Sequence, residues 1–188
     1  MKVICISGKA QHGKDTTASI ISRTLRERGF RVLVTHYADL LKYICRMFFG
    51  WNGEKDEDGR HLLQYIGTDV IRAQDQNFWV RFIGSVLSLF PDEWDFVLIP
   101  DTRFPNEISA LKGYGFDVSH LRVVRDGFDN GLTDKQNRHS SETALDEVAA
   151  DHMIHNNGSV GELIVQVHHL IDSMIEPMPL VDGREVID

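Results

Sequence analysis

The chain has 188 residues, of which 42% are hydrophobic and 26% are charged, and its formal net charge at pH 7 is −8. This length favours a single domain, over residues 1–188, with a proper hydrophobic core. The negative charge disfavours nonspecific binding to nucleic acid or to an anionic membrane. A small phosphorylated substrate stays compatible with it, because a few local cations can offset a negative total.

The two cysteines, Cys5 and Cys45, both have apolar neighbours. Buried free thiols are therefore expected, rather than a disulfide or a metal site. No stretch approaches the ~18 apolar residues of a membrane-spanning helix. The N-terminus has the pattern of a core strand and not of a signal sequence, so the expected location is the reducing cytoplasm.

A short apolar run at residues 2–7 opens into Gly8-Lys9-Ala10-Gln11-His12-Gly13-Lys14-Asp15-Thr16. This is the phosphate-binding loop G-x-x-x-x-G-K, in the strand–loop–helix setting that it requires. Backbone N–H groups of such a loop surround an anion, because glycine adopts conformations that side chains forbid. The positive end of the next helix points at the same anion, and Lys14 adds a mobile charge for the outer phosphates of a nucleotide such as ATP.

The position after Lys14 departs from the common motif. It is Asp15, where the common motif has a serine or threonine that ligates Mg2+. Thr16 is the nearest hydroxyl and could support the phosphates or the metal ion, but it could equally be an ordinary residue of the first helical turn. Asp15 could reach Mg2+ through water, although an acid in this turn is favourable without any metal.

Apolar periodicity predicts helices and strands in alternation along the chain. The predicted helices are 14–28, 40–49, two blocks within 60–90 that break at 74–77, a short one from Pro105, and 159–174. The predicted strands after the first are 31–37, 96–99, 118–124 and a weaker one at 152–155. Gly29 is expected to end the first helix and Asn77 to cap the helix after the break. The expected irregular segments are a solvated loop at 53–60, a mobile loop at 126–143 and a peripheral tail from Pro177.

This alternation predicts an α/β fold with three layers, in which a central parallel sheet of five strands lies between two layers of helices. Ligands of such sheets collect beyond the carboxyl ends of the strands. Residues 8–16, Asp39 and residues 101–103 all follow the ends of predicted strands. They are therefore expected to form one site.

Five segments together resemble the phage-type deoxynucleoside monophosphate kinases, namely 8–16, G-T-D-V-I-R at 67–72, F-W-V at 78–80, D-T-R-F-P-N-E at 101–107 and H-S-S-E at 139–142. They follow the family's order over residues 1 to about 160, and the combination is more specific than any single segment. The resemblance implies an adenylate-kinase-like P-loop NTPase fold, with a helical substrate-binding insertion at about 39–90 and a lid at about 126–143. It implies transfer of the γ-phosphoryl group of ATP, with Mg2+, to a deoxynucleoside monophosphate. If a phage encodes the chain, this reaction is expected in the cytoplasm of the host.

The predicted catalytic residues are Lys14, Asp101 and Arg103. Asp101 could hold hydrated Mg2+ or orient Arg103, and the alternative is a turn residue ahead of a helix. By resemblance Arg103 contacts the phosphate of the acceptor, for which an arginine suits bidentate recognition better than a lysine. The resemblance gives Arg72 the same role, with an exposed helical arginine as the alternative. Asn157 lies where related kinases close around adenine, and a plain turn explains it nearly as well.

The other predicted substrate contacts are Asp39, Lys42, Trp79, Arg138 and Glu142. Asp39 could instead cap the following helix. Trp79 could stack on a base, although aromatic residues at helical spacing more often belong to the core. Arg138 flanks the lid, which could close over the phosphates and exclude water, and a solvated loop arginine is its alternative. Glu142 ends the family-like H-x-x-E segment, although a short helix could simply begin there.

Two other functions stay open on the sequence. A related P-loop kinase could act on another phosphorylated small molecule, such as phosphomevalonate or dephospho-coenzyme A. A nucleotide-binding regulator or assembly subunit could use ATP as a switch, although a mere switch needs no second phosphate site at Arg72 and Arg103. The expected partners are small nucleotides, without nucleic acid or membrane. A homodimer, the preferred base and the choice of sugar all stay open.

Overall fold

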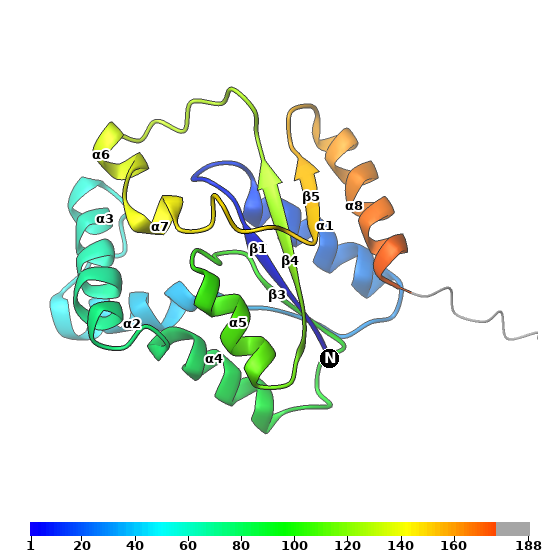
Figure 1. Ribbon diagram of the computed structural model, residues 1–188, viewed down its shortest axis with the longest axis horizontal. Helices are drawn as coiled ribbons and strands as arrows, with labels where there is room; N and C mark the ends of the chain where they lie inside the picture. Colours follow the sequence, from blue (N-terminus) through cyan, green and yellow to red (C-terminus); the bar gives the residue numbers. More distant parts are fainter. Residues whose placement is uncertain (176–188) are drawn as a thin grey trace, which may run out of the picture.

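A computed structural model describes residues 1–175, and the tail from Pro177, expected to be peripheral, lies outside the described residues. The centre of the molecule is a sheet of five strands (Figure 1). In spatial order they are β2 (Val32–Val34), β3 (Phe96–Ile99), β1 (Lys2–Ser7), β4 (Asp117–Val124) and β5 (His152–His155). Every neighbouring pair is parallel. The predicted α/β fold with a five-stranded parallel sheet is confirmed.

The central strand β1 is buried on both faces of the sheet. Because side chains alternate along a strand, Ile4 and Ile6 face one helical layer while Val3 and Cys5 face the other, and all four are at most 1% exposed. The first layer holds α1 (Lys14–Glu27) and α8 (Val160–Met174). The second holds α4 (Phe78–Leu89) and α5 (Pro105–Gly113), at the lower left of Figure 1. Cys5 and Cys45 are buried free thiols, as expected.

Four helices connect β2 to β3 and are called the insertion below. They are α2 (Tyr37–Phe49), α3 (Glu57–Gln64), the π-helix η1 (Tyr65–Arg72) and α4. A small core of Cys45, Trp51 and Ile66 packs α2, α3 and η1 together. Gly67 of η1 lies against α2, because a Cβ there would come within 2.6 Å of Leu41 Cδ2. The insertion therefore has packing of its own beside the main sheet.

Strand β2 is shorter than predicted, and Tyr37, expected at its end, is the first residue of α2. Asp101, just after β3, explains the difference. Its Oδ1 accepts from the N–H of Tyr37 at 3.1 Å and its Oδ2 from the N–H of Ala38 at 2.9 Å. Amides in a first helical turn have no partner within the helix, so the carboxylate favours a helix start at this point.

The structure agrees with the predicted end of α1 at Gly29, but it gives Asn77, at the start of α4, a different role from the predicted cap. Gly29 has a φ of 88°, as expected for the residue that ends α1. Helix α4 follows Asn77 as predicted, but the Asn77 side chain does not cap it. Instead Asn77 Oδ1 accepts from Nδ2 of Asn106 at 2.8 Å, which ties the start of α4 to α5.

Segment 126–143, expected to be a mobile loop, contains two short helices, α6 (Asp134–Asn137) and α7 (Ser140–Thr143). Helix α7 follows His139, whose Nδ1 accepts from the N–H of Ser141 at 3.2 Å, so the short helix that the sequence allowed there is confirmed. In Figure 1 both helices lie to the left of the carboxyl ends of the strands, on the side of the insertion.

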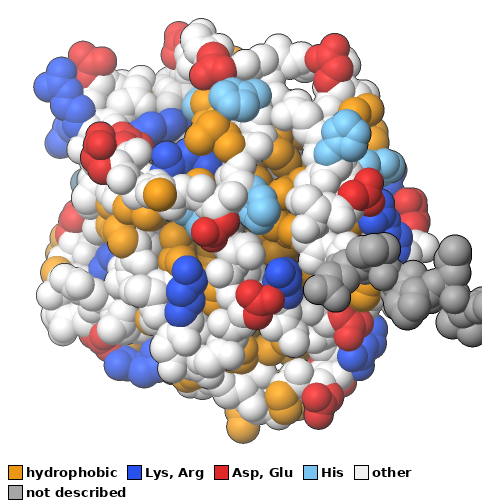
Figure 2. Space-filling model, turned by 45° about the vertical axis from the view of Figure 1, so that its right-hand side comes forward, with side chains coloured by type: hydrophobic (Ala, Val, Ile, Leu, Met, Phe, Trp, Pro, Cys, Tyr) orange, Lys and Arg blue, Asp and Glu red, His pale blue; other side chains and the backbone are white. Residues whose placement is uncertain are grey.

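Charge is dispersed over the face that Figure 2 shows, where Lys and Arg side chains are interspersed with Asp and Glu. A strong anion site therefore has to come from a few cations that converge in one hollow. Across residues 1–175, no helix has both the length and the apolar character needed to cross a membrane.

Candidate active site

The loop between β1 and α1 has the backbone shape of a phosphate cradle. Gly8 and Gly13 have φ values of 145° and 94°, which side chains rarely allow. A Cβ on Gly8 would lie 2.3 Å from the carbonyl oxygen of Val123, and one on Gly13 would lie 2.4 Å from Nδ2 of Asn156. Both glycines are thus required by close packing as well as by backbone conformation.

Lys14 folds back over this loop. Its Nζ donates to the carbonyl oxygens of Gly8 and Lys9, each at 2.8 Å. Burial lowers the pKa of Lys14 to about 8, and the positive charge of Arg103 contributes to the shift. A group that loses hydration in this way gains more from a negative ligand than an exposed lysine does, because charges interact more strongly at low dielectric.

A pocket of about 540 Å³ opens beside Lys14, between the ends of the strands, the insertion and segment 126–143. It is lined by six cations, Lys14, Lys42, Lys55, Arg60, Arg72 and Arg103. Six cations around one hollow of a chain with net charge −8 point to an anionic ligand. Four carboxylates, Asp15, Asp101, Glu107 and Glu142, also line it, so the cations outnumber them by two. The rest of the wall includes the apolar or neutral side chains of Leu41, Leu63, Gln64 and Trp79. The structure thus brings the phosphate-binding loop and residues 101–103 together.

Asp101 lines this pocket, but both of its carboxylate oxygens already cap α2. Burial raises its pKa above the ordinary value, against the effect of the two backbone N–H donors. Asp15 also lines the pocket, whereas Thr16 is exposed and does not. Among the described residues no group of three or more His, Cys, Asp or Glu side chains could hold a metal ion by itself.

Arg103 links the strand ends to segment 126–143. Its backbone N–H donates to Oε2 of Glu107 at 2.7 Å. Its Nη1 donates to the carbonyl oxygen of Ser141 at 3.0 Å and pairs with Oε1 of Glu142. The other oxygen of Glu142 accepts from the backbone N–H of Ala10 at 3.1 Å. One carboxylate therefore bridges the predicted acceptor contact and the phosphate-binding loop.

Arg72 is buried, so it is not the exposed helical arginine that the sequence left as an alternative. Its Nη1 lies 3.2 Å from Oε1 of Glu107, with exposed fractions of 8% and 5% for the two side chains. Its guanidinium also contacts Asn106 and covers the ring of Phe104 at 3.5 Å. Burial raises the pKa of Glu107 to about 7 although Arg72 lowers it. Arg72 is thus largely occupied by the protein itself.

Besides Arg72, Arg103 and Glu142, two more of the predicted substrate contacts lie on the pocket. Lys42 lines it and pairs with Asp39 at 2.9 Å, while Asp39 itself is not part of the lining. Trp79 is 6% exposed and belongs to the core under the pocket, with its indole Nε1 donating to the carbonyl oxygen of Gly67 at 3.1 Å. An edge of Trp79 therefore borders the hollow while most of the ring packs inside.

Two other predicted contacts lie away from the pocket. Arg138 is exposed and is not part of the lining. Asn157 is exposed, and its Nδ2 donates to Oδ2 of Asp126 at 2.7 Å. The neighbouring Asn156 is the residue that contacts the phosphate-binding loop, because its Nδ2 donates to the carbonyl oxygen of His12 at 3.0 Å.

Sequence reasoning missed part of the lining. Lys55 and Arg60 come from residues 53–60, which were expected to form a solvated loop, and Arg60 Nε donates to the carbonyl oxygen of Lys55 at 2.9 Å. Glu107 was part of a recognised segment but received no role. The sequence could have indicated a role for it, because Glu107 is the third residue of a helix that begins with Pro105. A glutamate at this position often accepts hydrogen bonds from the free N–H groups at the start of the helix.

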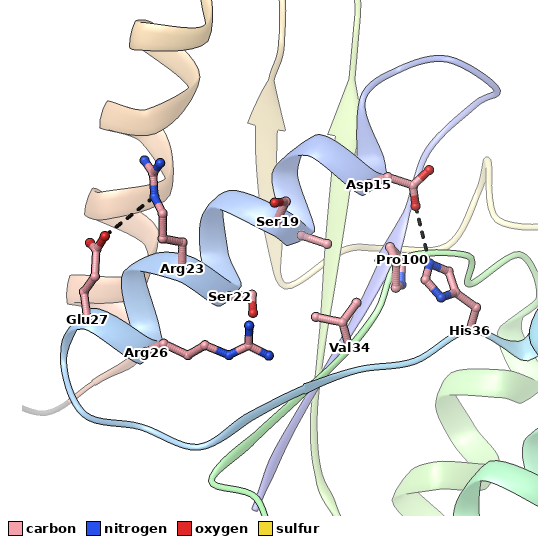
Figure 3. Close-up of a pocket in the computed structure, with 10 residues that line it drawn as sticks. Asp15, Ser19, Ser22, Arg23, Arg26, Glu27, Val34, His36 and Pro100 are labelled. Carbon is pink, nitrogen blue, oxygen red and sulfur yellow. Dashed lines mark ion pairs between the residues drawn. The ribbon is translucent and has the colours of Figure 1, made fainter.

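A second hollow, of about 590 Å³, lies on the other side of α1. Figure 3 shows it between α1 and the edge strand β2, with Ser22 and Arg26 pointing toward Val34. Arg26 Nη2 donates to the carbonyl oxygen of Val32 at 2.8 Å, so this guanidinium already covers the strand edge. The groove has neither the glycine loop nor Lys14. The residues predicted to bind phosphate therefore lie at the strand-end pocket and not at this groove, although the two hollows have similar volumes.

Comparison with known proteins identifies similar sequences, in a family model and in curated proteins. Residues 47–167 match the family model described as deoxynucleotide monophosphate kinase. The deoxynucleotide monophosphate kinase of Enterobacteria phage T4 is 32% identical over 114 residues, which are 60% of this chain and 44% of that protein. The match thus spans less than half the length of this curated relative.

Solved structures of P-loop kinases share the fold. The APS kinase of Mycobacterium tuberculosis, in complex with AMPPNP and APS, has a TM-score of 0.54 at 15% identity and covers 92% of this chain and 96% of its own. Dephospho-CoA kinase from Campylobacter jejuni has a TM-score of 0.52 at 13% identity, with 93% and 98% covered. At such identities the likeness concerns the fold alone.

Proposed function

This chain belongs to the deoxynucleotide monophosphate kinase family, and on that premise we propose that it transfers the γ-phosphoryl group of ATP to a deoxynucleoside monophosphate. The observation that carries the proposal is the single pocket in which a glycine loop with Lys14 faces Arg103 and the basic lining of the insertion. A pocket for ATP alone would need only the first of these two sets. Two sets suit two anionic ligands that meet end to end.

We assign the donor phosphates to the loop 8–16. The fit rests on the positive φ angles of Gly8 and Gly13, because a loop needs such conformations to turn its backbone N–H groups toward an anion. Lys14 would exchange its two carbonyl partners for phosphate oxygens, which satisfy a cation better. The turn at Asn156 and Asn157, next to the loop, is where we place the adenine end of the donor.

We assign the acceptor to the part of the pocket under the insertion. Arg103 is the proposed contact of the acceptor phosphate, since its side chain lines the pocket and is 37% exposed. Arg72 would act mainly by position, because it holds Glu107, which in turn binds the N–H groups of Arg103 and Phe104. Trp79 and its apolar neighbours form the wall beside which a base would lie.

Phosphoryl transfer needs positioning and positive charge more than covalent chemistry. Lys14 and Arg103 would stabilise the charge that spreads over the transferred group from its two sides. Segment 126–143 contributes Leu132, Gln136 and Ser141 to the lining, and we propose that it acts as a lid that excludes water. Mg2+, when bound, would neutralise phosphate charge, and Asp15 and Asp101, two of the carboxylates that line the pocket, could hold its water shell in place of Thr16, which does not line it.

A coupled assay of ADP release tests the proposal. The chain is incubated with ATP and Mg2+ and with each deoxynucleoside and ribonucleoside monophosphate in turn, and with phosphomevalonate and dephospho-coenzyme A in parallel. We expect ADP to form only with one or more deoxynucleoside monophosphates. Turnover with only one of the other acceptors would replace the proposed substrate class, and slow hydrolysis that no acceptor accelerates would favour the ATP-dependent switch instead.

A further inference from the structure

The carboxylate of Glu142 lies between the phosphate-binding loop and Arg103. Its Oε2 accepts from the backbone N–H of Ala10 at 3.1 Å, and its Oε1 pairs with the guanidinium of Arg103. The Glu142 side chain is 5% exposed. Loop amides and arginines are both donors that commonly bind phosphate oxygens in proteins. The carboxylate therefore holds the place where a phosphoryl group would be bound.

The segment that carries Glu142 is fastened to the same cations. Lys9 Nζ donates to the carbonyl oxygen of Glu142 at 2.5 Å and lies 2.6 Å from Oδ1 of Asp146. Arg103 Nη1 also donates to the carbonyl oxygen of Ser141 at 3.0 Å. Helix α7 and residues 144–146 are thus held on the anion site by Arg103, which lines the pocket, and by Lys9 of the phosphate-binding loop.

We propose that Glu142 is an internal stand-in for a phosphoryl group, which a nucleotide phosphate must displace, and that this displacement releases α7 from the phosphate-binding loop. The proposal rests on the proposed function only in taking the incoming anion to be a nucleotide phosphate. Two anions cannot share the same donors, because like charges a few ångströms apart in a half-buried pocket repel strongly. Until the ligand arrives, the carboxylate keeps the Ala10 amide and Arg103 paired and in place.

Two consequences follow from the exchange. Phosphate binding should be weaker than the bare cradle would allow, because a buried carboxylate has to leave its partners. It should also be coupled to movement of residues 140–146, since the same event removes the contacts that hold them. A residue that merely orients Arg103 would give neither effect, because it would stay in place when the ligand binds.

The test uses inorganic pyrophosphate as the probe and Glu142→Gln as the variant, with Glu147→Gln as the matched control. Glu147 is an exposed glutamate that directly follows residues 140–146, so the control makes the same change in net charge. Calorimetric titration should show about tenfold tighter pyrophosphate binding by Glu142→Gln, because the neutral amide no longer competes. Glu147→Gln should bind within about twofold of the unaltered chain.

Hydrogen exchange read over residues 140–146 gives the second measurement. In the unaltered chain, pyrophosphate should speed exchange in this segment, and in Glu142→Gln exchange should be fast before any ligand is added. Asp146→Asn weakens only the tie to Lys9, so it should speed exchange while tightening pyrophosphate binding by no more than about threefold. This variant keeps Glu142 and serves as the test if Glu142→Gln does not fold.

Weaker or unchanged pyrophosphate binding by Glu142→Gln would overturn the proposal and make Glu142 a residue that orients Arg103 in the complex. For Asp146→Asn, unchanged exchange over residues 140–146 would do the same. Neither measurement requires an acceptor or any turnover. If pyrophosphate displaces Glu142 but the chain phosphorylates no deoxynucleoside monophosphate, this inference is therefore supported while the proposed function is contradicted.

Discussion

The two sides of the pocket, which we propose for the phosphate donor and for the acceptor, are built in opposite ways. The donor side is one continuous stretch, residues 8–16, whose shape follows from Gly8 and Gly13. The acceptor side is assembled from Arg72 in the insertion, Glu107 in α5 and Arg103 after β3, which are joined by a buried ion pair and by backbone hydrogen bonds. Because of this difference, a substitution on the donor side should weaken nucleotide binding with little effect on the stability of the fold. A change on the acceptor side should affect both.

The sharpest test of the donor side is Lys14→Ala. Lys14 bonds only to loop carbonyl oxygens, which can turn to water, so the fold should survive its removal. Phosphoryl transfer should fall by at least about a thousandfold, because a charge in contact with the transferred group is lost. ADP release and thermal unfolding measure the two effects. A large fall in melting temperature would show that the loop depends on Lys14 for its structure, and the contrast between the two sides would fail.

On the acceptor side, Arg72→Ala should destabilise the protein itself. It leaves the carboxylate of Glu107 buried without its cation, which typically costs about 3–5 kcal/mol of the free energy of unfolding. Arg23→Ala is the matched control, because Arg23 is also a helical arginine paired with a glutamate, at 3.7 Å, but in solvent. It should cost less than about 0.5 kcal/mol. Urea unfolding of both variants gives the comparison, and equal losses would contradict it.

The same buried pair predicts a dependence of stability on pH. Burial raises the pKa of Glu107 from 4.5 to about 7, so the folded chain keeps a proton there that the unfolded chain releases. The contribution of this group is complete below pH 4.5 and is lost as pH rises through about 7, to the extent of about 3 kcal/mol. The lowered pKa of Lys14 acts only above pH 8, outside this window.

Glu107→Gln isolates this effect, because it removes the titrating group and keeps the shape of the side chain. The unfolding free energy of the unaltered chain minus that of this variant should therefore fall, toward negative values, as pH rises from 5 to 7.5. Urea titrations at a series of pH values measure it. Two parallel curves would show that Glu107 does not change its protonation between these pH values, and that Arg72 holds it ionised throughout.

The two sides also differ in how well they could be predicted from the sequence. The donor loop was predicted residue by residue, because its chemistry depends on neighbours in the chain. The acceptor side was predicted only where a segment resembled a family, as at Arg72 and Arg103. The role of Asp101 as the cap of α2, and the place of Arg60 in the pocket, depend on contacts between distant residues or on the path of the chain. Local composition does not record such contacts.

The smallest expected effect separates two neighbouring asparagines at the rim of the donor side. Asn156 Nδ2 donates to the carbonyl oxygen of His12 and lies against Gly13, whereas Asn157 pairs with Asp126 in solvent. Asn156→Ala should raise the KM for ATP about five- to tenfold, because the loss of one hydrogen bond of about 1 kcal/mol loosens the loop. Asn157→Ala should change the KM by no more than about twofold, with kcat unchanged in both variants.

A larger effect of Asn157→Ala would reverse this assignment. The adenine would then contact Asn157 directly, as the resemblance to related kinases implies, and the pairing with Asp126 would have to open when ATP binds. Repeating the measurement with GTP as donor distinguishes the two cases. A contact to the base would change the preference between ATP and GTP, whereas loosening of the loop through Asn156 would raise both KM values by the same factor, since the phosphates of the two nucleotides are identical.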